Sequence, residues 1–105
     1  MSDEWSEASA AASHADHVGP VLEASEPGRA VLAAILQLNQ HVEVMDRGAY
    51  LRVLVPGGCV VTRRAIEDAL GKSFVLPGDL EAVMPAFKGF MRMNDEQVEW
   101  QRHLT

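Results

Sequence analysis

Residues 46–76 read DRGAYLRVLVPGGCVVTRRAIEDALGKSFVL, and this stretch decides the fold class. Residues 49–55 predict a β-strand with two faces, one formed by Leu51, Val53 and Val55 and the other by Tyr50, Arg52 and Leu54. Pro56-Gly57-Gly58 is a strong turn signal. A short valine-rich strand over residues 59–61 follows, and we expect it to pair back on the first strand as a hairpin.

A capped helix completes this stretch. Thr62 fits the N-cap of a helix over residues 63–70, and Gly71 stands where a left-handed C-terminal cap belongs. Arg63 and Arg64 lie in the first turn, where positive charge opposes the helix dipole. Either one of them serves a partner or both are ordinary solvated side chains.

The pattern on both sides of this stretch extends the fold. Pro20 cannot donate to a strand ladder, so it predicts that the first strand lies at a sheet edge or that the strand begins there. We expect a chain break at 26–28, strands over 18–24, 42–45, 86–93 and 97–103, and helices over 29–39 and 77–84. The order β-α-β-β-β-α-α-β-β predicts a small single α+β domain with two to three helices and a mostly antiparallel sheet.

Residues 1–17 differ from the rest of the chain. They are rich in alanine and serine, carry four acids and contain no lysine or arginine. Such a segment buries too little surface to offset its ordering entropy, so we expect a disordered tail followed by one domain over residues 18–105. The tail is either inert or orders on a partner, with Trp5 as an anchor.

Composition excludes several functional classes. A net charge of −6 argues against nucleic acid as a partner, since phosphate binding needs a basic patch. The start has no secretory pattern, and no stretch approaches the ~20 apolar residues of a membrane span. Cys59 is the single cysteine, which fits a reducing cytoplasm and a buried small hydrophobe.

The sequence offers no convincing catalytic constellation. His14-x-x-His17 has metal-ligand spacing only if the tail is helical, and no further ligand follows nearby. No nucleophile–base pair or phosphate loop is visible, so we expect no catalytic residue, no metal and no cofactor. A well-built domain of this kind favours a protein that acts by binding.

Two segments are candidates for a docking surface. The helix over 29–39 is apolar over a wide arc, with Val31, Ile35 and Leu38 as the expected core stripe. Leu32 and Leu36 form a neighbouring stripe, which is either buried on a second side or exposed for a partner. Gly89 interrupts an apolar strand and marks either a bulge or a rim that packs on another protein. We expect Gly89→Leu to obstruct that partner more than it harms the fold.

Several blocks, in order, resemble the effector proteins of bacterial multicomponent diiron monooxygenases, the partners of toluene, phenol, alkene and methane hydroxylases. The blocks are VGPV (18–21), EVMDRGAYLRV (43–53), VTR (61–63), ALGKSF (69–74), AFKGFM (86–91) and DEQVEW (95–100). The resemblance covers roughly residues 18–103, and no block is a catalytic signature.

The resemblance implies a non-catalytic, cofactor-free subunit that binds the diiron hydroxylase and alternates or competes with a ferredoxin or reductase. Family members alter the hydroxylase's conformation and so affect oxygen activation, electron coupling and regiospecificity. By position, residues 85–89 match the segment that faces the hydroxylase, and the tail and residues 18–20 match segments on its surface. The candidate partner-binding residues are therefore Val18, Gly19, Pro20, Pro85, Ala86, Phe87 and Gly89, together with Leu32 and Leu36.

The alternative is a small ligand-binding or adaptor α+β domain unrelated to oxygenases. A pocket with a perturbed acid or histidine would favour it. The pocket of the hydroxylase determines the substrate of the monooxygenase, so this chain does not reveal it.

Overall fold

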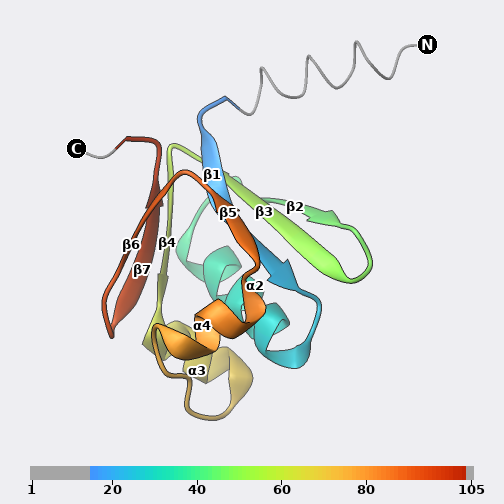
Figure 1. Cartoon of the computed structure of the whole chain (residues 1–105), viewed down its shortest axis with the longest axis vertical. Coiled ribbons are helices and arrows are strands. Elements are labelled where there is room, and N and C mark those ends of the chain that lie inside the picture. The colour runs from blue at the N-terminus through green and yellow to red at the C-terminus, as the bar shows by residue number, and fades with distance from the viewer. Residues whose placement is uncertain (1–14, 104–105) are drawn as a thin grey trace.

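A computed structural model of the protein describes residues 15–103, and it confirms the α+β fold (Figure 1). The described residues form three helices and two antiparallel sheets. The elements are β1 His17–Glu23, α2 Glu26–Leu38, β2 Glu43–Asp46, β3 Tyr50–Pro56, β4 Gly58–Thr62, α3 Arg63–Leu70, α4 Gly78–Val83, β5 Ala86–Lys88, β6 Phe90–Met93 and β7 Gln97–Gln101. None of these helices is long and apolar enough to cross a membrane.

The first sheet has the order β2-β3-β1-β5, so β1 lies inside it and the predicted edge position is wrong. Pro20 is tolerated there because the ladder between β1 and β3 is interrupted around it. The register joins β1 to β3 at residues 17–18 and 21–23 and leaves out Gly19 and Pro20. A missing N–H costs little where no ladder bond is made.

The second sheet has the order β4-β7-β6, and the predicted hairpin between β3 and β4 is wrong. β3 is already flanked by β2 and β1, so neither of its edges is open to β4. The turn after Pro56 therefore carries the chain out of the first sheet and into the second, where Cys59 pairs with Trp100 on β7.

The strand predicted over 86–93 is two strands. Gly89 has φ +108° and separates β5, which pairs with β1, from β6, which pairs with β7. A single segment thus supplies an outer strand to each sheet.

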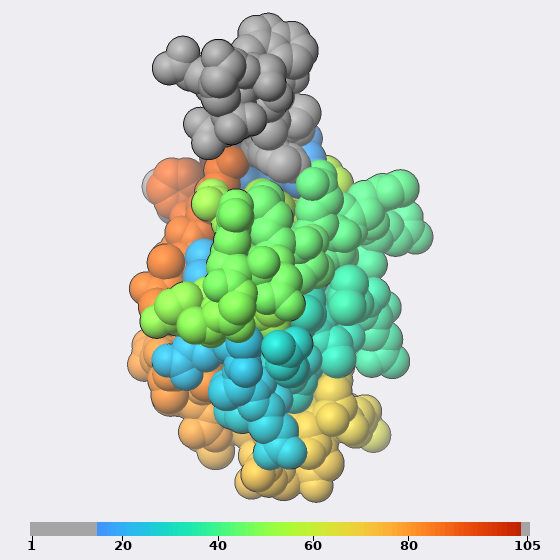
Figure 2. Space-filling model, turned by 90° about the vertical axis from the view of Figure 1, so that its right-hand side faces the viewer, coloured from blue at the N-terminus to red at the C-terminus, as the bar shows by residue number. Residues whose placement is uncertain are grey.

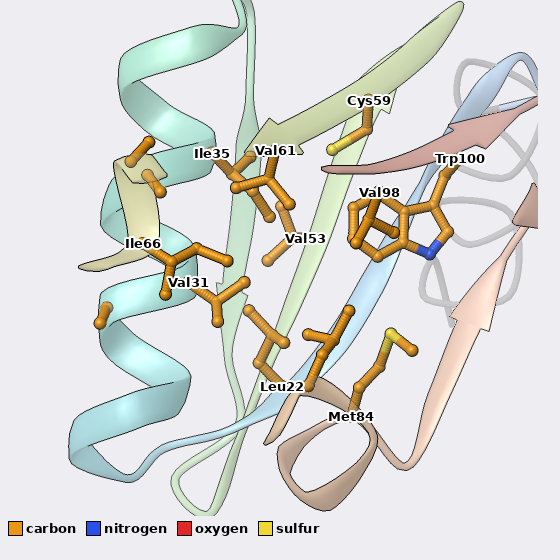
Figure 3. Close-up of a cluster of buried hydrophobic side chains, with 14 of the residues drawn as sticks. Leu22, Val31, Ile35, Val53, Cys59, Val61, Ile66, Met84, Val98 and Trp100 are labelled. Carbon is orange, nitrogen blue, oxygen red and sulfur yellow. The ribbon is translucent and has the colours of Figure 1, made fainter. Parts of the chain in front are cut away.

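The core lies between the sheets and the helices, as Figure 3 shows for side chains from α2, β3, β4 and β7 that point toward one another. Val98 and Trp100 share one face of β7, and both are fully buried. Cys59 is buried and free, and burial raises its pKa to about 12, so its thiol stays protonated and packs as a small hydrophobe.

The first helix begins earlier than predicted. Glu26 and Pro27 belong to its first turn, and the Ser25 hydroxyl accepts a hydrogen bond from the Gly28 amide at 3.2 Å. A proline fits this turn because its missing N–H would have no helical partner. Val31 and Ile35 face the core as expected, but Leu38 is 41% exposed at the end of the helix.

The second helix confirms its predicted caps. The Thr62 hydroxyl accepts from the Ala65 amide at 3.1 Å, and Gly71 adopts a left-handed conformation with φ +81°. Ile66 is fully buried on the expected face.

Asn39 joins the end of α2 to the free edge of β4. Its side-chain oxygen accepts from the Val60 amide at 3.0 Å, and its side-chain nitrogen donates to the Val60 carbonyl at 2.7 Å. The amide side chain thus occupies the position of one more strand beside β4.

Candidate docking surface

The most distinctive surface feature is the segment over residues 85–93, which we call the strap. It consists of Pro85, β5, Gly89 and β6, and Figure 1 shows it rising from α4 to an apex and descending along β7. Because β5 and β6 are the outer strands of different sheets, the strap closes the molecule on the side where the two sheets meet.

Gly89 is required at the apex by the protein's own packing. A β-carbon at this position would lie 2.8 Å from the Gln101 carbonyl oxygen and 2.8 Å from Cγ1 of Val18. The close approach predicted from the sequence is therefore made by β1 and β7. Gly89→Leu would therefore also strain the fold. The expectation that it obstructs a partner more than it harms the fold stays a prediction.

The strap nevertheless exposes apolar surface. Phe87 is 42% and Phe90 45% exposed, and Pro85, Ala86 and Gly89 are also exposed. Phe87 pairs with Pro20 and lies at the free edge of the first sheet, while Phe90 pairs with Gln101 on the outer face of the second. Two half-exposed phenyl rings on one short segment are typical of a protein–protein contact.

The structure places Val18, Gly19 and Pro20 inside the fold. All three are buried, and β1 is covered along both edges by β3 and β5. Their contact with a partner stays a prediction, and their burial speaks against it. The related suggestion for Trp5 falls outside the described residues, and so does the first histidine of the His14-x-x-His17 pair.

The apolar stripe of α2 is divided. Leu32 is half-buried and packs against the core, whereas Leu36 is 49% exposed. Leu38 is also exposed, but it lies two residues from Leu36 and so points to another side of the helix. A role for Leu32 and Leu36 in docking stays a prediction.

Arg63 has a structural explanation. Its guanidinium lies 3.0 Å from Glu67 Oε1 and 3.1 Å from Glu96 Oε1, and its Nε donates to the Asp95 carbonyl at 3.2 Å. These contacts raise the pKa of Arg63, with the hydrogen bond to Glu96 as the largest cause. Arg63 therefore ties α3 to the β6–β7 turn, which accounts for a basic residue in the first turn of α3.

The titratable groups of the described residues do not gather at a metal site. Within residues 15–103, no three His, Cys, Asp or Glu side chains are placed to hold a metal ion. The ring of His17 lies 3.0 Å from Asp16 Oδ1 and 3.3 Å from Glu43 Oε2, so it links β1 to β2 at one end of the first sheet. What the described geometry offers is a shaped, partly apolar surface for another macromolecule.

Fold and surface together define a small α+β binding protein built on two antiparallel sheets. Its family is identified by comparison: residues 16–101 match the MmoB/DmpM family, and the chain belongs to that family. The chain is 42% identical over 85 residues to the effector subunit of the alkene monooxygenase system of Xanthobacter autotrophicus. The aligned region covers 79% of this chain and 83% of that protein.

Solved structures show the same fold. A chain in the structure of a phenol hydroxylase–regulatory protein complex superposes with a TM-score of 0.73 at 18% identity, covering 81% of this chain and 97% of that one. The soluble methane monooxygenase regulatory protein B superposes with a TM-score of 0.65 at 24% identity, covering 85% of this chain and 67% of that one.

No individual docking role was predicted for Phe90, Tyr50 or Arg52. With residues 86–93 taken as one strand, Phe90 falls within an apolar run that belongs equally well to a core. The available signal was Gly89, since a glycine break allows the two halves of the run to serve different sheets. Tyr50 and Arg52 alternate with core residues, but alternation does not say whether their face is covered.

Proposed function

We propose that this protein is the effector subunit of a bacterial multicomponent diiron monooxygenase. It binds the hydroxylase component, regulates it, and alternates or competes there with the ferredoxin or reductase component. The observation that carries this proposal is the 42% identity to an alkene monooxygenase effector subunit, which extends over most of both chains. The described residues support a role in binding, because they offer exposed aromatic surface.

The effector performs no chemistry and acts by differential affinity. A ligand shifts a conformational equilibrium only by as much as it prefers one state over the other. An effector that binds the oxygen-reactive hydroxylase more tightly raises the population of that state. Oxygen activation, coupling of electrons to product and regiospecificity then change while the reacting groups stay in the hydroxylase.

The strap is the proposed docking element. Phe87 and Phe90 are exposed aromatic side chains of the type that dominates binding energy at interfaces. They project from two short strands whose outer edges are free, so another protein can approach them directly. Because each strand is held in a different sheet, the separation of the two rings is fixed before binding, which lowers the entropy cost of association.

The test uses the hydroxylase encoded in the same gene cluster, with its ferredoxin and reductase. Product formation is measured against effector concentration for wild type, Phe87→Ala and Phe90→Ala. We expect the concentration for half-maximal stimulation to rise by about tenfold for Phe90→Ala. Val75→Ala is the control, because Val75 is 61% exposed and lies on the loop before α4.

Melting curves accompany each variant, since Phe87 pairs with the buried Pro20 of β1. A wild-type protein that neither binds the hydroxylase nor changes its turnover or coupling would reject the effector role and favour an unrelated adaptor. A folded Phe87→Ala, Phe90→Ala double variant with wild-type stimulation would leave the role intact and remove the strap from the interface.

A further inference from the structure

Among residues 15–103, the helices pack on one face of the first sheet and leave its other face uncovered. Residues directly opposite each other on antiparallel strands share a face. Val21 pairs with Arg52 on β3 and with Ala86 on β5, and Arg52 pairs with Met45 on β2. These four residues form one row across all four strands, and Tyr50 lies on the same face two residues from Arg52.

The helices lie on the opposite face. Leu22 and Val53 point that way, and they belong to the buried cluster that includes Val31 and Ile35 of α2. The row of Val21, Met45, Arg52 and Ala86 therefore faces outward. In Figure 2, β2 and β3, drawn in green, spread over the middle and upper part of one side of the molecule with no helix in front of them.

The outward row is more apolar than a solvated sheet face requires. Tyr50 is 44% exposed, Arg52 and Ala86 are exposed, and Val21 and Met45 are half-buried. An antiparallel sheet with one face in water usually alternates apolar residues inward with polar residues outward. Here three of the four residues in the row are apolar, and the fourth is an arginine. Tyrosine, methionine and arginine are the residue types enriched at protein interfaces.

The row is continuous with the strap. Ala86 belongs to β5, so it is a member of both the strap and the row. Its neighbour Phe87 points to the opposite face of the same edge strand, and both residues are exposed. A partner that covers the free edge of β5 therefore meets Ala86, and next to it Val21 and Arg52. Because the two surfaces adjoin, we expect the partner that binds the strap to cover the open face as well.

We propose that the hydroxylase interface extends from the strap across the open face of the first sheet, with Tyr50 and Arg52 as contact residues. The inference rests on the effector role proposed above. We expect the hydroxylase to place an apolar patch over Val21 and Ala86. We also expect an acidic side chain of the hydroxylase against Arg52, because a planar guanidinium can bind a carboxylate in bidentate fashion.

The experiment measures the dissociation constant of the full-length effector with the purified hydroxylase, by titration at two salt concentrations. Tyr50→Ala is expected to weaken binding by about tenfold, as for an interfacial aromatic anchor. Arg52→Gln is expected to weaken it severalfold and to reduce the salt dependence, because it removes one charge pair that salt screens. Arg64→Gln is the matched control, since it removes one positive charge from an exposed site on α3.

Melting curves establish that each variant is folded, and Arg52→Gln provides a second variant if Tyr50→Ala loosens the end of β3. Dissociation constants within twofold of wild type for both variants, while Phe90→Ala binds weakly, would overturn the extended interface and leave the effector role standing. A wild-type chain that does not bind would reject the effector role itself. A dimer of this chain that dissociates on Tyr50→Ala would also overturn the proposal, because a second copy would then be the occupant.

Discussion

The apex at Gly89 and the corner at Gly71 both place a glycine at positive φ, and the two regions use it differently. At Gly71, φ is +81° and a β-carbon would have no neighbour within 4 Å. At Gly89, φ is +108° and a β-carbon would press on Gln101 and Val18. The corner needs a backbone conformation only, whereas the apex also needs the space that a side chain would fill. A glycine in a sequence does not distinguish these two requirements.

Gly89→Ala should therefore have the largest effect. We expect it to lower the free energy of unfolding by about 3 kcal/mol, because it combines an unfavourable backbone conformation with overpacking. Urea denaturation of the isolated protein measures this loss. In the Val18→Ala background the same substitution should cost less, since one of the two close neighbours has gone. Equal losses at Gly89 and Gly71 would remove the distinction between the two regions.

Gly71→Ala tests the conformational requirement by itself. We expect a loss of about 1 kcal/mol, the usual penalty for a β-carbon at a left-handed cap. Gly57→Ala should behave similarly, because Gly57 also has φ +81° with nothing within 4 Å of the added atom. Denaturant midpoints that do not move for either variant would contradict this interpretation of the corner.

The corner at Gly71 should also respond to acid. Glu67 Oε2 accepts a hydrogen bond from the Phe74 amide at 2.9 Å, and this bond, with a further contribution from Arg63, lowers the pKa of Glu67 below 4.5. A lowered pKa in the folded state gives stability that is present above pH 4.5 and is lost as the pH falls below it.

The measurement is the melting temperature of wild type and Glu67→Gln between pH 3 and pH 7. We expect a small difference at pH 7 that shrinks below about pH 4.5. A difference that stays constant across this range would show that the carboxylate charge does not contribute at this corner.

Removing residues 1–14 should have the smallest effect. We expect the melting temperature to change by no more than about 2 °C, because an acidic segment rich in alanine and serine has little apolar surface to bury. The boundary matters, since His17 begins β1 and contacts Asp16 and Glu43. Deleting residues 1–17 should cost more than deleting 1–14, and equal melting temperatures would show that these contacts are dispensable.

Local features of the fold could be predicted from the sequence. Thr62 and Gly71 bound α3 as expected, and Trp100 faces the core, because caps and alternation depend on residues close in sequence. Strand pairing depends on which edges other strands have taken. For that reason β4 pairs with β7 and not with β3, and β1 lies inside its sheet in spite of Pro20.

The candidate docking residues divide in the same way. Pro85, Ala86 and Phe87 are exposed on the strap, whereas Val18, Gly19 and Pro20 are buried. The sequence supplies the apolar character of each segment, but exposure depends on the packing of distant elements. The open face of the first sheet became visible only when the register placed Arg52 beside Val21 and Ala86.

The side-chain amide of Asn39 affects how readily the protein self-associates at high concentration. Exposed strand edges recruit other chains and lead to aggregation. Beside β4 this danger is reduced, because the peptide group of Val60 is already bonded to Asn39. On β2, Glu43 and Asp46 would set like charges against each other in a self-paired copy. Molecules lost to self-association would lower the free concentration available for binding by mass action. One side-chain amide at the end of α2 thus helps to keep the effector available in solution.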